Sequence, residues 1–145
     1  METTNRPGRI VTFYSFKGGV GRTMAVANVA FLAALNGKRV LVMDWDLEAP
    51  GLHYYFRGLL EASEVRALKD TPGVLDLLWD WTLNVRQADG PADAQRLIER
   101  YTNGEAFEGM VRTVLADLPL GGRLDFINAG GRTIRTTAPT AQPYE

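Results

Sequence analysis

Apolar side chains along the chain are gathered into short runs separated by glycines and charged residues. Residues 10–15 are β-branched and aromatic on both faces, which is typical of a strand covered by helices on both sides. The segment 23–36 is rich in Ala, Val and Leu and is closed by Gly37, so it predicts a helix packed on a sheet. Residues 40–43 form a second short apolar run that stops at Asp44. This order of strand, helix and strand predicts a right-handed parallel βαβ unit.

The second half of the chain has a weaker pattern. Pro72 and Gly73 precede a stretch with one apolar stripe, which predicts the start of a helix. Residues 92–101 and 107–118 predict two more helices, separated by an Asn-Gly breaker. The apolar run 124–128 predicts a third strand. Alternating helices and strands of this kind predict the α/β fold class.

These elements divide the chain into three segments. Residues 1–9 are polar and are predicted to be a flexible N-terminal arm. Residues 10–131 contain all the predicted helices and strands and are predicted to form one domain. From residue 132 to residue 145 the composition turns to Thr, Pro, Ala and Gln without periodicity, which predicts a disordered tail.

Composition excludes several functional classes. With 145 residues, 46% hydrophobic and 23% charged, the chain resembles ordinary soluble globular proteins. A net charge of −1 without a run of Lys or Arg gives no signal for nucleic acid or membrane surfaces. The absence of cysteine excludes disulfides and thiolate metal sites, and residues 1–9 lack the pattern of a signal peptide. We therefore expect a cytoplasmic protein.

A glycine-rich loop between the first strand and the first helix carries the clearest chemical signal. Gly18, Gly19 and Gly21 allow the close backbone approach that a phosphate requires. The helix that begins at Arg22 and Thr23 would point its free N–H groups at the same place. The Thr23 hydroxyl is placed to bind a Mg²⁺ ion that bridges phosphates. The loop therefore predicts a nucleotide-phosphate site.

Two residues depart from the usual phosphate-loop pattern, G-x-x-x-x-G-K-S/T. Phe16 occupies the first glycine position and Arg22 the lysine position. A purely structural glycine-rich turn is the alternative interpretation, and Lys17 directly before the glycines argues against it. Arg keeps the charge of Lys but has a longer reach and different hydrogen-bond directions. We expect phosphate binding to survive this change and turnover to be more sensitive to it.

The stretch from Ser15 to Thr23 resembles the deviant Walker A loop of the ParA/MinD ATPases, K-G-G-x-G-K-S/T. The resemblance continues through residues 40–46, a strand that ends in an Asp-x-Asp pair. Residues 18–52 are similar, nearly word for word, to a branch of bacterial signalling-type ATPases with K-G-G-V-G-R and D-W-D-L-E-A-P-G-L. This resemblance implies a three-layer P-loop NTPase fold with a parallel sheet, and ATP and Mg²⁺ as ligands.

Individual roles follow from the same resemblance. Asp44 would lie in or near the second shell of the metal that Thr23 ligates, and Asp46 would orient the attacking water. Lys17 corresponds to the family's lysine that reaches across a nucleotide-sandwich homodimer to the partner's phosphates. The residues implied to bind the nucleotide are Lys17, Gly18, Gly19, Val20, Gly21, Arg22, Thr23 and Met24.

One part of the family pattern has no match in the chain. After Asp46, no apolar run ends in the Asp of a Walker B motif, and Asp125 lies at the start of its predicted strand. We therefore interpret residues 10–131 as the N-terminal part of a ParA/MinD-like nucleotide-binding domain, in an incomplete P-loop fold: a fragment, a truncated product, or a component completed by another chain. The leading hypothesis is a Mg²⁺-dependent ATP-binding switch module that hydrolyses ATP only when the domain is completed. The alternatives are a non-hydrolysing regulatory module that signals to a partner or fused effector domain, and a degenerate fragment.

Overall fold

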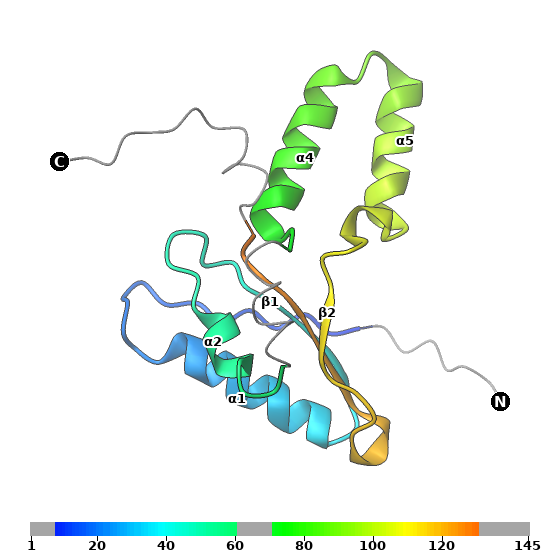
Figure 1. Cartoon of the computed structure of the whole chain (residues 1–145). Coiled ribbons are helices and arrows are strands. Elements are labelled where there is room, and N and C mark those ends of the chain that lie inside the picture. The colour runs from blue at the N-terminus through cyan, green and yellow to red at the C-terminus, as the bar shows by residue number, and fades with distance from the viewer. Residues whose placement is uncertain (1–7, 61–70, 131–145) are drawn as a thin grey trace.

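The computed structural model describes residues 8–60 and 71–130. Most of the predicted N-terminal arm, residues 1–9, lies outside the described residues, and so does the whole predicted tail, residues 132–145. The helices and the sheet that surround the glycine-rich loop all lie within the described ranges (Figure 1).

The first helix agrees with its prediction. Helix α1 spans Arg22–Leu35, directly after the glycine-rich loop. At its C-terminal end, the N–H groups of Asn36 and Gly37 donate to carbonyls of the last turn, at 3.1 and 3.0 Å. Gly37 has a φ of 75°, the left-handed conformation expected of a glycine that ends a helix.

Three more α-helices follow within the described ranges. The short α2 spans Leu52–Phe56, and the predicted helix after Pro72 is α4, Val74–Gln87. The helix predicted over residues 92–101 is α5, Pro91–Thr102. Helices α4 and α5 form a hairpin that extends away from the sheet (Figure 1). No helix in the described part of the chain is long and apolar enough to cross a membrane.

In the described part of the chain, the sheet has three strands in the order β1-β3-β2. Strand β1 (Arg39–Met43) and strand β3 (Arg123–Ile127) match the second and third predicted strands and pair in parallel. Strand β2 (Arg112–Leu115) pairs antiparallel with β3. The α/β class is therefore confirmed, with a mixed sheet where a parallel one was expected.

The predicted helix over residues 107–118 is wrong. This stretch contains the end of a short 3₁₀ turn, Glu105–Phe107, and then strand β2, and a second 3₁₀ turn, Pro119–Gly121, follows directly after it. Two local features explain the difference. Gly109 has a φ of 75°, which interrupts a helix, and Thr113 and Val114 are β-branched residues that favour a strand. Pairing with β3 then outweighed the helical periodicity.

The strand predicted over residues 10–15 is also absent. The segment has no regular secondary structure, and no backbone hydrogen bond joins it to another described residue. Its side chains are largely exposed, including Ile10, Val11 and Tyr14. A strand requires a hydrogen-bonded neighbour on at least one side. Strand β3 supplies one to β1, whereas the described residues supply none to residues 10–15.

The main core lies between one face of the sheet and helices α1 and α2. It is formed by Ala27, Ala30, Ala34, Val42, Leu52, Phe56, Val114, Leu124 and Phe126. A smaller cluster around Val74, Met110 and Ile127 covers the opposite face near the C-terminal end of β3. Strands β1 and β3 are parallel, so their C-terminal ends lie side by side, near the start of α1. Open α/β sheets commonly bind ligands at this end of their strands.

Candidate functional site

The glycine-rich loop is open to solvent. All residues from 16 to 20 are exposed. Gly19 and Gly21 have φ values of 74° and 79°, in the left-handed region that favours glycine. A Cβ atom placed on Gly18 or Gly19 would meet no other atom within 4 Å. The backbone of the loop is thus accessible to a ligand.

The N-terminus of α1 faces the same loop. Gly21 occupies the capping position, and no side-chain hydrogen bond caps this end of the helix. The Gly21 carbonyl accepts from the N–H of Ala25, 2.9 Å away. The N–H groups of the first turn have no acceptor within an α-helix and carry its partial positive charge. This arrangement favours an anion.

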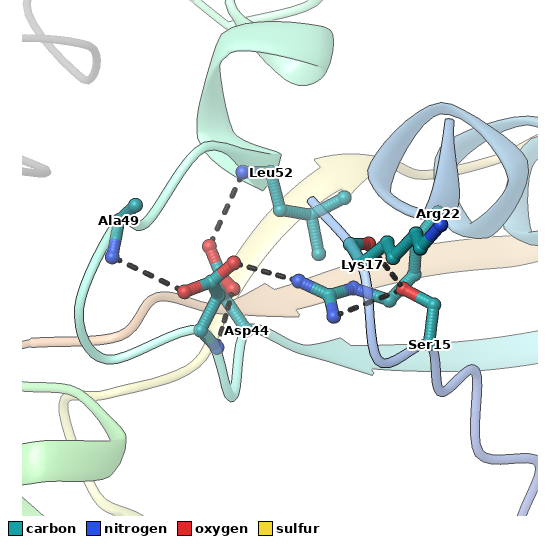
Figure 2. A network of polar contacts seen from close by, with 7 residues as sticks. Ser15, Lys17, Arg22, Asp44, Ala49 and Leu52 are labelled. Carbon is teal, nitrogen blue, oxygen red and sulfur yellow. Dashed lines mark hydrogen bonds and ion pairs between the residues drawn. The ribbon is translucent and has the colours of Figure 1, made fainter. Parts of the chain in front are cut away.

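Arg22, in the first turn of α1, connects the loop to the end of β1. Its Nη2 donates to Oδ2 of Asp46 at 2.7 Å, and about a third of each side chain is exposed. Its Nη1 lies 3.5 Å from Oγ of Ser15, and this hydroxyl donates to the Lys17 carbonyl at 3.1 Å. Figure 2 shows Arg22 between Ser15 and the loop that follows β1.

Two carboxylates organise the loop after β1. Asp44 is buried; its Oδ1 accepts from the N–H of Asp46 at 3.1 Å and its Oδ2 from the N–H of Leu52 at 3.2 Å. Oδ1 of Asp46 accepts from the N–H of Ala49, also at 3.1 Å (Figure 2). Asp44 therefore joins both ends of the loop, and its hydrogen bond to Leu52 fixes the start of α2.

The structure brings only some of the sequence-predicted residues together. Arg22, Asp44 and Asp46 belong to one hydrogen-bond network, and Lys17 enters it through its carbonyl oxygen. Thr23 is half-buried at the start of α1. Of the other predicted residues, Lys17, Gly18, Gly19 and Val20 are exposed in the loop, Gly21 is half-buried, and Met24 is exposed in the first turn of α1. The ion pair between Arg22 and Asp46 was not predicted, because the two residues are 24 positions apart and meet only in the folded chain.

No preformed metal site is found in the described part of the chain, where no three His, Asp or Glu residues are grouped as metal ligands. Asp125, which the sequence did not favour as a Walker B residue, lies away from the loop. It accepts from Arg123 and Thr113 within the sheet, at 2.7 and 2.8 Å.

A separate cavity of about 450 Å³ lies at the base of the α4–α5 hairpin. Its lining is Pro72, Asp76, Asp80, Arg100, Glu105, Ala106, Glu108 and Met110. Asp80 accepts from the Tyr101 hydroxyl at 2.8 Å and pairs with Arg100 at 3.2 Å. Burial, followed by the hydrogen bond to Asp80, raises the pKa of Tyr101 to about 12. These contacts connect the two helices, so Asp80 has a structural role in the hairpin.

Comparison with known families identifies the fold. The family model described as "CobQ/CobB/MinD/ParA nucleotide binding domain" matches residues 11–128, which is most of the chain. The chain belongs to this family. The matched range contains the glycine-rich loop, α1, β1 and the loop with Asp44 and Asp46.

Two curated relatives share a shorter similarity. Each is named "Putative tyrosine-protein kinase EpsB", one from Ralstonia solanacearum and one from Ralstonia nicotianae. Each is 43% identical over 61 residues, which is 41% of this chain and 7% of the relative. The match thus covers only a small part of these longer proteins. No solved structure matches the chain.

Proposed function

We propose that the chain is the Mg²⁺-dependent ATP-binding module of a ParA/MinD-like nucleotide switch. The observation that carries this proposal is the exposed loop in which two left-handed glycines precede the uncapped N-terminus of α1. Arg22 adds a positive charge at the same end of the helix. Family membership supports nucleotide binding by the domain. ATP, Mg²⁺ and the residue roles are our extension of that membership.

The proposed roles follow the observed positions. Backbone N–H groups of residues 18–24 would bind the phosphates, and Thr23 would offer its hydroxyl to Mg²⁺, which supplies charge neutralisation when bound. Asp44 would lie near the metal without direct coordination, because both its carboxylate oxygens already accept hydrogen bonds from backbone N–H groups. Asp46 would orient the attacking water. Lys17 is exposed at the loop, where it could reach the phosphates of a second copy in a nucleotide-sandwich homodimer.

Hydrolysis is proposed only for a completed domain. Strand β1 has a hydrogen-bonded neighbour on one side alone among the described strands, and the apolar residues 10–15 lie exposed. A further strand that carries a Walker B acid would fill this gap and supply the missing carboxylate. Because the kinase-named relatives are much longer than their matched part, we also propose a fused or partner effector domain in the cytoplasm. Joining such a strand to the chain should raise both ATP turnover and the unfolding midpoint.

The second candidate is a regulatory module that binds nucleotide without hydrolysing it. One observation favours it: the two side chains proposed for phosphate binding and for water orientation, Arg22 and Asp46, are bonded to each other. Turnover measured beside binding in the completed domain separates the candidates. Tight binding without turnover would support the regulatory module.

Titration of the chain with ATP, with and without Mg²⁺, tests the proposed function. Thr23→Ala removes the proposed metal ligand and leaves the backbone loop intact, so affinity should fall much more with Mg²⁺ than without it. Thr102→Ala, at the exposed end of α5, is the matched control and should change neither affinity. Equal losses in both conditions would exclude Thr23 as a metal ligand. Failure of the unaltered chain to bind ATP would overturn the proposed function.

A further inference from the structure

The ion pair between Arg22 and Asp46 connects two parts of the site that a bound phosphate would affect differently. Arg22 belongs to the helix end that faces the glycine-rich loop, whereas Asp46 belongs to the loop between β1 and α2. Besides this 2.7 Å contact, Asp46 accepts from Ala49 and donates its own N–H to Asp44. The Asp46 carboxylate therefore accepts hydrogen bonds from its own loop, at Ala49, and from the Arg22 guanidinium.

We infer that Asp46 competes with the phosphates of the ligand for Arg22, so that phosphate binding releases Asp46 and changes the loop of residues 44–51. The inference rests on the proposed function and deepens it. It gives Arg22 a positioning role toward Asp46 in addition to its contact with phosphate. The loop after β1 then reports whether the phosphate site is occupied.

The chemistry of arginine supports this assignment. Its planar fork reaches Asp46 with one terminal nitrogen and approaches Ser15 with the other. A lysine has a single terminal nitrogen and could not make both contacts in this geometry. The arginine at the position of the family's usual lysine therefore makes two side-chain contacts, with Asp46 and with Ser15.

The exposure of the pair decides which anion is favoured. About a third of each side chain is exposed, and ion pairs exposed in this way are usually weak. A phosphate offers several charged oxygens to the same guanidinium, and the N–H groups at the start of α1 bind it in addition. A carboxylate and a phosphate that share one cation also repel each other. The phosphate should therefore displace Asp46.

Trp45 provides a reporter for the released state. It lies between Asp44 and Asp46, and 59% of its surface is exposed. A change in the hydrogen bonds of Asp46 alters the backbone on either side of this indole. Replacing the two other tryptophans, Trp79 and Trp81, by phenylalanine isolates its fluorescence. Both lie on α4, in the hairpin away from the loop.

A double-mutant cycle with pyrophosphate and ATP as ligands tests the inference. Asp46→Asn should raise the affinity about three- to tenfold, because the competitor for Arg22 is lost. In the Arg22→Gln background, the same substitution should change affinity by less than about twofold. Glu48→Gln removes an equal charge from an exposed position in the same loop and is the matched control, expected to stay within about twofold. Arg22→Lys, which keeps the charge but not the fork, should lose most of the coupling.

The fluorescence of Trp45 gives an independent measurement. Pyrophosphate should change it in the unaltered loop, whereas Asp46→Asn should show the changed signal before any ligand is added. An Asp46→Asn effect of the same size in both Arg22 backgrounds would show a general charge effect and overturn the inference, while the proposed function would stand. Normal pyrophosphate binding without a change in Trp45 fluorescence would also overturn the inference and leave the proposed function standing. A chain that binds neither pyrophosphate nor ATP would overturn both.

Discussion

Two apolar runs of similar composition have very different surroundings in this protein. Residues 10–15 and strand β1 flank the glycine-rich loop and α1, and both predict buried strands. Val42 in β1 is 6% exposed, whereas Val11 in the first run is 72% exposed. The run that became a strand is the one whose backbone pairs with β3.

The comparison shows that an apolar pattern specifies a tendency to be buried and leaves the partner unspecified. Burying the backbone of a strand requires that its N–H and C=O groups find hydrogen-bond partners. Strand β1 finds them in β3, with a register that pairs Val42 with Phe126. Residues 10–15 find none among the described residues, so their side chains lie exposed although they are apolar.

Truncating the fully buried Phe126 should have the largest effect on stability. Its ring lies on the core face of β3 and contacts Phe56 edge to face, with 5.4 Å between centroids. We expect Phe126→Ala to lower the free energy of unfolding by about 3–5 kcal/mol. Phe16→Ala, directly after the exposed run, should stay within about 0.5 kcal/mol, because Phe16 is 94% exposed. Urea denaturation measures both.

A large loss for both phenylalanines would break the comparison, because it would show that the chain at the end of the first run is packed in solution. Hydrogen exchange sharpens the result. Backbone amides of β1 that donate to β3 should exchange slowly, whereas those of residues 10–15 should exchange nearly as fast as in an unfolded chain.

Much of the fold was predictable from local signals. Gly37 marked the end of α1, Pro72 and Gly73 marked the start of α4, and the charged residue Asp44 marked the end of β1. Each of these signals acts within a few residues, where backbone geometry and side-chain chemistry decide the structure. The glycine-rich loop was found in the same way.

The incorrect predictions depended on contacts between distant parts of the chain. The sequence predicted a helix where β2 pairs with β3, and a strand over residues 10–15, which have no described partner. At the candidate site, the motif indicated Arg22 and Asp46 separately, and only the fold showed that they form an ion pair. Their roles in binding and hydrolysis stay predictions.

The approach of β3 to α1 provides a test of intermediate size. Gly122 precedes β3, and a Cβ atom at this position would lie 1.8 Å from the Ala34 carbonyl oxygen. Gly122→Ala should therefore displace β3, which pairs with β1, and lower the free energy of unfolding by about 1–3 kcal/mol. Gly58→Ala, where a Cβ meets no atom within 4 Å, is the matched control and should stay within about 0.5 kcal/mol. Similar thermal midpoints for both variants would contradict the observed contact.

The smallest effect is expected on the outer face of β1, where pairing and side-chain burial can be separated. Leu41, like Val42, is paired with β3, but its side chain points to the opposite face of the sheet and is 51% exposed. Leu41→Thr should cost less than about 1 kcal/mol, because threonine favours strands and little apolar surface is uncovered. Val42→Thr buries a hydroxyl of nearly the same size as the lost methyl and should cost about 1–3 kcal/mol. Equal losses in urea denaturation would show that another element covers the outer face of β1 in solution.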